Sequence, residues 1–437
     1  MSEWVVPASY GQERLWFVDQ AEPGSPAFNI VTSVRLPFPV SADEVRRALG
    51  VVVGRHEALR TSLRAVDDVP HQVVHPEVAV DVPEHDGDPE ALLAALAVTP
   101  IPLDDAPLWR AALARVPDGW LLGFVAHHAV FDGASIPVLR AELTELCEST
   151  VDGRPAALPE LAIQYPDFAA WQRDQDLTAG LCFWRAELAG LPAVHAVPTD
   201  RPRPPHGPAP GGDVLVDLPD STGRSVAALA RAARTTPFAV YLAACAALVQ
   251  RLSDQDDVVL GVPVGGRHVD GTQPLVGMFV NTVPLRVDLG GDLTFGALLE
   301  RVRDTVARAW EHQDTPFQHV VRAVAPPRDP AVAPVCQLGF NYLPDLGTGT
   351  GNGVARDDLL FGLTDRDLRL EFNAALFDRD TALRIAHRYR RLLAAAVAEP
   401  DRPLWTLPVF EEHPPTGLLD RAGAPVPPGV AGRTADG

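Results

Sequence analysis

A run of apolar residues at positions 120–126 (WLLGFVA) ends directly at two adjacent histidines, His127 and His128. A continuous apolar run of this length is typical of a strand that is buried on both faces. A short loop with Gly133 comes next, and the spacing of the leucines at positions 139, 143 and 146 predicts a helix after it. The sequence therefore predicts a fold of helices and strands in which both histidines lie where a buried strand leaves the core.

Other segments support a fold that mixes helices and strands throughout, α/β or α+β. Ser41 and Glu44 form a capping box at the start of a predicted helix over 41–49, and Thr236 precedes a proline at the start of another. Further predicted elements are strands at 108–116 and 258–264, a turn at 117–119, and helices at 294–311 and 380–397. The Pro/Gly-rich stretch 198–212 predicts an inter-lobe linker or a long surface loop without regular structure, and 411–437 predicts a frayed tail.

All basic residues of the chain are arginines: 37 arginines and no lysine stand against 57 acidic residues, for a net charge of −20. The absence of lysine excludes Schiff-base chemistry and a P-loop, and the negative charge argues against nucleic-acid binding. No apolar run approaches the ~18 residues of a membrane span. The N-terminal residues lack the layout of a signal peptide, so we expect a cytoplasmic location without membrane contact.

The motif HHAVFDG (127–133) contains residue types suited to acyl transfer. Acyl transfer needs a neutral imidazole held rigidly beside the nucleophile, and a histidine at the exit of a buried strand meets that need. Asp132 either orients a histidine directly or locks the loop by pairing with an arginine elsewhere, and Gly133 permits a sharp turn. The alternative is a pair of core histidines beside a capped turn, and on local grounds the two interpretations are evenly balanced.

Other kinds of site fit the sequence less well. Adjacent residues on a strand point to opposite faces, so His127 and His128 cannot both chelate one metal ion. The chain contains no GxSxG nucleophile elbow. The run GTGTGNG (347–353) follows no apolar strand and opens no helix, so we predict a flexible loop there and no dinucleotide site.

Residues 127–133 resemble the HHxxxDG signature of condensation domains of nonribosomal peptide synthetases, in the chloramphenicol-acetyltransferase-like superfamily. Wax-ester synthases and polyketide-associated acyltransferases share that signature. Further segments resemble the condensation-domain set in the family's order: SYGQERLWF (9–17), RHEALRTSL (55–63), YPDFAAWQ (165–172), VGMFVNTVPLR (276–286), HQDTPFQHVV (312–321), RDPAVAPVCQLGFNY (328–342) and the last helix, 376–393. The resemblance extends from Ser9 to about Leu407.

The resemblance implies roles for the motif. His128 matches the catalytic histidine, which positions or deprotonates the amine or hydroxyl of the acceptor, or stabilises the tetrahedral intermediate. His127 and Asp132 match structural positions, with Asp132 paired to the arginine that Arg286 resembles. Gly133 matches the glycine whose backbone N–H lies near the reacting centre as an oxyanion donor.

Two further residues, Arg60 and Asn341, match motif positions near the substrate tunnel of the family. The segment that contains Asn341 departs from the family pattern, because Val335-Cys336 stands where the family has Leu-Phe. This departure leaves the tunnel-lining role of the segment open.

The resemblance also implies an architecture and partners. Two chloramphenicol-acetyltransferase-like lobes, 1–177 and 178–410, would form a V around a tunnel, with a flexible tail at 411–437. A peptidyl or acyl carrier protein would deliver a thioester on its own 4′-phosphopantetheine arm. A small-molecule or carrier-bound acceptor would enter from the other side, to give an amide or an ester. No cofactor or metal of the chain itself is implied, and no nucleic-acid or membrane partner.

Two alternatives stay open beside condensation. One is a CoA-dependent O-acyltransferase of the wax-ester or polyketide-associated type, and the other is a non-catalytic module that recruits partners. The additional motifs favour condensation over the first alternative, and the intact HHxxxDG signature favours catalysis over the second. Because the sequence begins at Met1 and carries no carrier or adenylation motif, a free-standing enzyme is expected in preference to an excised domain.

Overall fold

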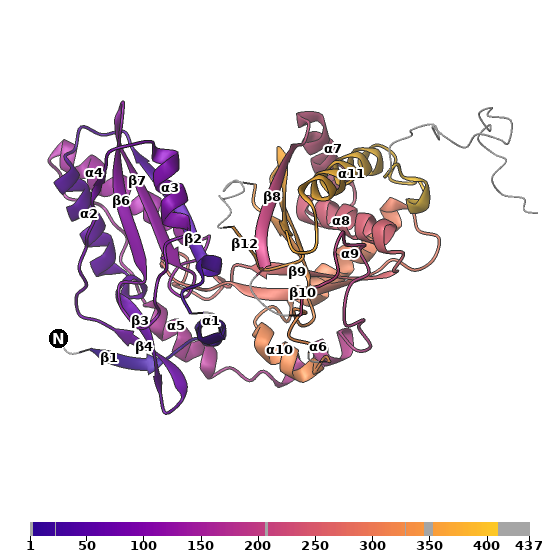
Figure 1. Ribbon diagram of the computed structural model, residues 1–437, viewed down its shortest axis with the longest axis horizontal. Helices are drawn as coiled ribbons and strands as arrows, with labels where there is room; N and C mark the ends of the chain where they lie inside the picture. Colours follow the sequence, from indigo (N-terminus) through magenta and orange to yellow (C-terminus); the bar gives the residue numbers. More distant parts are fainter. Residues whose placement is uncertain (1–2, 22, 206–208, 328, 345–352, 410–437) are drawn as a thin grey trace, which may run out of the picture.

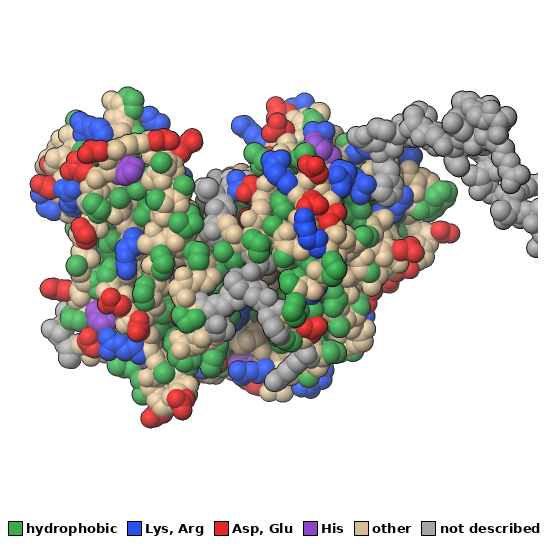
Figure 2. Space-filling view, viewed as in Figure 1, with side chains coloured by type: hydrophobic (Ala, Val, Ile, Leu, Met, Phe, Trp, Pro, Cys, Tyr) green, Lys and Arg blue, Asp and Glu red, His purple; other side chains and the backbone are tan. Residues whose placement is uncertain are grey.

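The helices and strands form two lobes that stand side by side (Figure 1). The computed structural model describes residues 3–409 apart from 22, 206–208, 328 and 345–352. In the space-filling view, a cleft separates the upper parts of the lobes (Figure 2). The mixed helix and strand class predicted from the sequence is confirmed, and so are its two lobes. The predictions for 347–352 and for the tail 411–437 lie outside the described residues.

The first lobe is built on a four-stranded sheet in the order β2-β7-β6-β5. Its strands are β2 (Asn29–Leu36), β7 (Gly119–His127), β6 (Trp109–Val116) and β5 (Glu84–His85). Helices α2 (Ala42–Arg55), α3 (Pro89–Ala97) and α4 (Ser135–Asp152) pack around this sheet. The predicted capping box of Ser41 and Glu44 is present at the start of α2.

The central strand β7 is buried on both faces, as its apolar run predicts. Leu122, Phe124 and Ala126 belong to one hydrophobic cluster of the lobe, whereas Val125 belongs to the other. A side chain at Gly123 would collide with leucines of α3, so this glycine lets the helix lie close to the strand. The strand therefore ends in the middle of the lobe, with packed side chains on both sides.

A smaller antiparallel sheet, β1-β4-β3, completes the first lobe. Its strands are β1 (Trp4–Pro7), β4 (Val69–Val74) and β3 (Thr61–Val66), and the adjoining helical segments are α1 (Tyr10–Ala21), η1 (Pro26–Phe28), η2 (Glu57–Arg60) and α5 (Tyr165–Arg173). Residues 174–177 then lead from α5 to α6 (Thr178–Glu187), whose Trp184 packs into the core of the second lobe.

The second lobe contains a seven-stranded sheet in the order β10-β9-β11-β13-β14-β8-β12. The strands are β8 (Ala209–Asp217), β9 (Asp257–Val264), β10 (Asn281–Asp288), β11 (Leu338–Tyr342), β12 (Val354–Ala355), β13 (Leu359–Leu363) and β14 (Asp367–Asn373). The helical segments are α7 (Asp220–Ala232), α8 (Pro237–Ser253), α9 (Phe295–Trp310), α10 (Phe317–Val324), α11 (Arg379–Ala398) and η3 (Leu404–Thr406).

Helices cover only one broad face of this sheet, and the sheet lies on the side nearer the first lobe (Figure 1). The alternation along β11 follows from this arrangement. Leu338 and Phe340 pack into the helix-covered core, so Gly339 and Asn341 face the other way, toward the cleft. The predicted helices near 237, 294–311 and 380–397 and the strand at 258–264 are confirmed as α8, α9, α11 and β9.

The segment between β9 and β10, residues 265–280, crosses into the first lobe, and we call it the crossing segment. Leu275 and Phe279 of this segment belong to a hydrophobic cluster of the first lobe. The backbone N–H of Val276 donates to Nδ1 of the buried His56 at 3.2 Å. The hydroxyl of Tyr165 donates to the carbonyl oxygen of Met278 at 2.8 Å. The two lobes are therefore joined by a segment of one chain that is packed inside the other lobe.

The prediction of a stretch without regular structure at 198–212 is wrong at its end. Strand β8 begins at Ala209 and includes both glycines, Gly211 and Gly212, which pair with β14. A side chain at Gly211 would collide with the backbone of β12, and one at Gly212 would collide with the ring of Phe372. The glycines that read as loop residues are thus required for close packing within a sheet.

Among the described residues, no single helix is long and apolar enough to cross a membrane. One pair of helices, α7 and α8, passes the test together by length and composition, with a bend of 106° between them. Most residues of α8 are buried in the core of the second lobe.

Candidate functional site at the end of strand β7

His128 follows the last residue of β7 and is held by two backbone groups. Its backbone N–H donates to the carbonyl oxygen of Phe28 at 2.8 Å, and its ring Nδ1 lies 2.9 Å from the carbonyl oxygen of Phe131. Because a carbonyl oxygen only accepts, Nδ1 carries the proton. In the neutral ring, the lone pair is therefore on Nε2, and no hydrogen bond from the described residues engages that atom.

The surroundings of His128 keep its ring neutral. Burial, and then the positive charges of Arg356 and Arg14, lower its pKa from 6.5 to about 4. Part of the residue nevertheless remains accessible. His128 thus offers an unprotonated nitrogen at neutral pH.

His127 occupies a different environment although it is the next residue in the chain. It is 2% exposed, and its Nδ1 accepts a hydrogen bond from the backbone N–H of Ala129 at 3.1 Å. Burial, and then the neighbouring His128, lower its pKa to about 3. Its ring is a neutral core side chain that fixes the turn after β7.

Asp132 locks the loop to the crossing segment, and no hydrogen bond among the described residues joins its carboxylate to either histidine. Its Oδ1 accepts hydrogen bonds from the backbone N–H and the hydroxyl of Ser135, at 2.8 and 2.7 Å, and from Nη2 of Arg267 at 2.8 Å. Its Oδ2 accepts from the backbone N–H of Phe279 at 3.1 Å. Of the two roles that the sequence left open for this carboxylate, the structure has the pairing with a distant arginine.

The partner of Asp132 is Arg267, and the expected pairing with Arg286 is wrong. Arg286 lies in the middle of β10, where its guanidinium bonds both carboxylate oxygens of Asp257 on the neighbouring strand β9. Its side chain therefore stays within the second lobe. Arg267, in contrast, lies at the start of the crossing segment, which carries it into the first lobe, where its guanidinium also stacks on the ring of Phe279 at 4.2 Å.

Gly133 begins the approach to helix α4 and leaves free space beside the motif. A Cβ atom at this position would meet no heavy atom within 4 Å, and its φ angle lies outside the left-handed region. The backbone at this position therefore needs no conformation that only glycine adopts. Its lack of a side chain keeps a small volume open next to the histidine loop.

The other two predicted residues lie apart from the motif. Arg60, in η2, donates to the carbonyl oxygen of His75 and pairs with Glu57 at 3.1 Å, which makes it part of the packing of the first lobe. Asn341 lies on β11 and faces the cleft, as the alternation along that strand requires. No hydrogen bond among the described residues connects either of them with His128.

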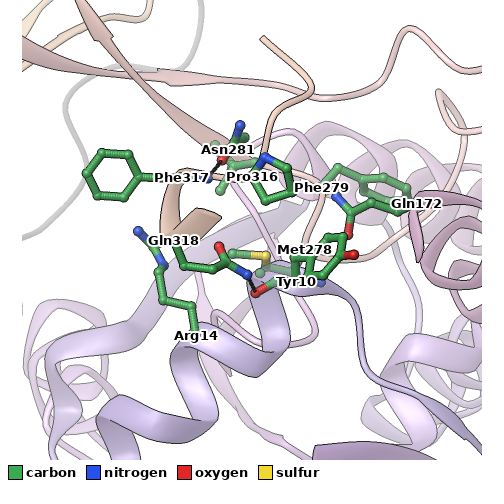
Figure 3. Close-up of a pocket in the computed structure, with 11 residues that line it drawn as sticks. Tyr10, Arg14, Gln172, Met278, Phe279, Asn281, Pro316, Phe317 and Gln318 are labelled. Atoms are coloured by element: carbon green, nitrogen blue, oxygen red, sulfur yellow. Dashed lines mark hydrogen bonds between the residues drawn. The ribbon is translucent and has the colours of Figure 1, made fainter. Parts of the chain in front are cut away.

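A small, partly open pocket lies between the two lobes beside this region. Arg14 and Gly11 of α1 form one side of it, and Asn281, Phe317 and Gln318 of the second lobe form another (Figure 3). The amide of Gln318 bridges the lobes by donating to the backbone oxygen of Tyr10. His128 does not line this pocket, but Arg14 does, and its charge also acts on His128.

Sequence reasoning missed Arg267, Arg14 and Arg356, which come from separate segments, and nothing in their spacing connects them with the histidines. It also missed Ser135, which follows Asp132 by three positions and bonds its carboxylate. No group of three or more His, Cys, Asp or Glu side chains in the described part of the chain is arranged to hold a metal ion.

Comparison with known proteins identifies relatives over almost the whole chain. Residues 2–355 match the condensation domain family. The chain is 36% identical to phosphinothricin tripeptide synthetase PhsC of Streptomyces viridochromogenes over 93% of its own length. It spans 40% of the length of that relative.

Two solved structures are similar in fold and sequence. The X-domain from teicoplanin biosynthesis is 26% identical with a TM-score of 0.83, over 92% of this chain and 97% of that one; this domain has also been solved in a complex with OxyB. SgcC5 of Streptomyces globisporus is 26% identical with a TM-score of 0.79, over 91% of this chain and 100% of that one. With the family match over most of its length, its two lobes and its HHAVFDG motif, the chain belongs to the condensation domain family of nonribosomal peptide synthetases.

Proposed function

We propose that this condensation domain forms an amide bond, or less commonly an ester, between an acyl thioester on a carrier protein and an amine or hydroxyl acceptor. The thioester would arrive on the phosphopantetheine arm of the carrier, which makes that arm part of the substrate. The family membership supports this class of reaction. The residues of the site decide how the reaction would proceed.

The neutral, partly accessible ring of His128 is the observation that carries the proposal. Its Nδ1–H is occupied by the carbonyl of Phe131, at 2.9 Å, so the lone pair on Nε2 is available. With a pKa of about 4, the ring is neutral at neutral pH and carries no proton on Nε2. It can therefore accept a hydrogen bond from a neutral amine and orient the nitrogen lone pair toward a carbonyl carbon.

The step can be written with its protons. The amine nitrogen attacks the thioester carbonyl, a C–N bond forms, and the carbonyl oxygen becomes an oxyanion. The nitrogen is then positively charged and more acidic, so it gives a proton to Nε2 of His128. Collapse of the intermediate breaks the C–S bond, and the departing pantetheine thiolate takes up that proton.

The other residues of the motif would support His128 without touching the reacting atoms. The bonds of Asp132 to Arg267 and Ser135 fix the loop, and His127 fixes the turn before it. The free space beside Gly133 would give the substrate access to the loop. The backbone N–H of Gly133 remains a candidate hydrogen-bond donor to the oxyanion. Asn341 remains a candidate residue of the second lobe to line the substrate tunnel.

The proposal is tested with an acyl-loaded carrier protein and a panel of amines, with intact-protein mass spectrometry of the carrier and chromatography of the product. We expect the wild type to unload the carrier into an amide, and His128→Ala to lose at least about 100-fold in rate. His71→Ala, which changes a histidine on the β4 hairpin, is the matched control. Transfer from acyl-CoA but not from the carrier would overturn the proposal in favour of a CoA-dependent acyltransferase.

The similarity to the teicoplanin X-domain supports a second candidate, a module that recruits a partner protein. That domain has been solved in complex with OxyB, so an interaction surface rather than a reaction can be the function of this fold. Under this alternative, the carrier keeps its acyl group in the assay above, and His128→Ala behaves as the wild type. A partner encoded beside this chain would then bind both proteins equally in calorimetry.

A further inference from the structure

The charges of two arginines from opposite lobes, Arg14 and Arg356, both act on His128. Arg14 projects from α1 of the first lobe into the inter-lobe pocket, toward Phe317 and Gln318 of the second (Figure 3). Arg356 follows β12 of the second lobe, and its guanidinium carbon lies 5.8 Å from the centre of the Phe28 ring. The carbonyl oxygen of the same Phe28 accepts a hydrogen bond from the backbone N–H of His128 at 2.8 Å.

Both arginines lack an ion-pair or hydrogen-bond partner among the described residues. This distinguishes them from the arginines of the surrounding framework, such as Arg267 and Arg203, whose guanidinium groups each bond a buried aspartate. Burial, and then the charge of Arg356, lower the pKa of Arg14, whereas Asp357 raises it. Two like charges that act on each other and have no ion-pair partner favour the binding of an anion.

The carboxyl group of Asp357 interacts electrostatically with both arginines, but its single charge offsets at most one of theirs. Asp357 lies against β11, where its Oδ2 would be 2.9 Å from a Cβ atom on Gly339, and it forms no ion pair with either arginine. Burial raises its pKa to about 6 with contributions from Glu371 and Asp358, against the opposing effects of Arg356 and Arg14. The neighbouring Asp358 is already bonded to Arg203 and His195.

We propose that Arg14 and Arg356 form a subsite for the carboxylate of the acceptor, so that the acceptor is a free amino acid or a related amino carboxylate. This inference rests on the proposed function. An amine that is hydrogen-bonded to His128 places the group on its α-carbon within reach of the same surroundings. In a free amino acid that group is an anion, whereas in a carrier-bound acceptor it is a neutral thioester.

The phosphate of the donor's pantetheine arm is a less suitable anion for this place. It lies at the opposite end of the arm from the thioester, so it cannot be next to His128 while the thioester carbonyl is there. A planar carboxylate also matches the fork of donors that a guanidinium presents. The subsite therefore selects the acceptor and not the donor.

The test compares matched ligands that differ only in this charge. Each of the proteinogenic amino acids is titrated into the protein by calorimetry as the free acid and as its primary amide, without any donor present. We expect at least one free acid to bind about 10–100-fold more tightly than its amide, the size of a charge-assisted hydrogen bond. Equal binding of each acid and its amide, or no binding by any acid, would overturn the subsite.

Variants assign the effect to the arginines. Because Arg356 is exposed, Arg356→Gln should fold normally. It should weaken binding of the free acid about 10–100-fold and leave binding of the amide unchanged. Arg356→Lys should retain part of the difference in affinity between acid and amide. The control is Arg35→Gln, because Arg35 lies on β2 and forms an exposed ion pair with Asp118. Arg14→Met is the second variant, checked for folding by circular dichroism. An unchanged acid-to-amide ratio in both variants would contradict the assignment.

The assay with acyl-loaded carrier separates this inference from the proposed function. If acids bind in an arginine-dependent manner but no amide forms with any acceptor, the subsite stands and the proposed function fails. If amide forms only with carrier-bound acceptors, and no free acid binds, the proposed function stands and the subsite fails. In the case we expect, free acids serve as acceptors, and Arg356→Gln raises KM for the acid with a smaller effect on kcat.

Discussion

Oδ1 of Asp132 lies 2.8 Å from Nη2 of Arg267, and the two side chains are 3% and 7% exposed. The pair connects the loop that carries His128 with the segment that crosses from the second lobe. The same guanidinium also donates to the backbone oxygens of Thr272 and Leu275, so it shapes the crossing segment as well as holding it. The position of the histidine loop therefore depends on both lobes.

Removing Arg267 should destabilise the protein strongly. Arg267→Met leaves the carboxylate of Asp132 buried without its charged partner, which costs about 3–5 kcal/mol of unfolding free energy. Arg286→Gln is the informative comparison, because its partly exposed pair with Asp257 predicts a loss of about 1 kcal/mol. Urea denaturation of both variants measures the two losses. A larger loss for Arg286→Gln would contradict the pairing described here.

Gly133→Ala should separate folding from substrate access. The added Cβ meets no atom within 4 Å, so we expect a change of no more than about 0.5 kcal/mol in stability. If acceptor or donor passes through the space beside the loop, the methyl group should raise KM or lower kcat. Thermal unfolding and the carrier assay measure the two effects, and a variant with wild-type kinetics would show that this space is not used.

Gly212→Ala tests the close packing inside the second-lobe sheet. A methyl group on β8 collides with the ring of Phe372 on β14, and overpacking of this kind costs about 1–3 kcal/mol. Gly265→Ala, where a Cβ meets nothing within 4 Å, is the matched control and should be nearly neutral. Chemical denaturation gives both values. Equal stability of the two variants would argue against β8 as a packed strand.

The two histidines of the motif should make stability depend on pH. Their pKa values in the folded protein are about 3 for His127 and about 4 for His128, below the 6.5 of an unperturbed histidine. The unfolded chain therefore binds protons first as the pH falls. The stabilisation is fully present above pH 6.5, and it is lost progressively toward pH 4. In His128→Gln, the fall of unfolding free energy over this interval should be less steep than in the wild type.

The local part of the site was predictable from the sequence, because its signals are local. The apolar run before His127 indicates a buried strand, and the caps at Ser41 and Thr236 mark helix starts that the structure confirms. Each of these patterns spans only a few residues. The position of the histidines at a strand end follows directly from the apolar run.

The distant partners were not predictable, since no pattern connects them. Arg267 is separated from Asp132 by 135 positions, and a chain whose basic residues are all arginines offers many candidate partners, Arg286 among them. The crossing segment brings Arg267 into the first lobe by packing of Leu275 and Phe279, which is a tertiary effect. Strand β8 was hidden for a related reason, because its glycines serve contacts with strands far along the chain.

The most direct test of the account is the single-turnover rate of amide formation from an acyl-loaded carrier, measured for the wild type and for His128→Gln at several pH values. We predict a wild-type rate at least about 100-fold higher. The ratio of the two rates should stay constant between about pH 5.5 and 8, because a ring with a pKa of about 4 is neutral throughout that range and the protonation of the amine cancels in the ratio. Equal rates for the two proteins, or a ratio that falls as the pH drops through 6.5, would contradict the role given to His128.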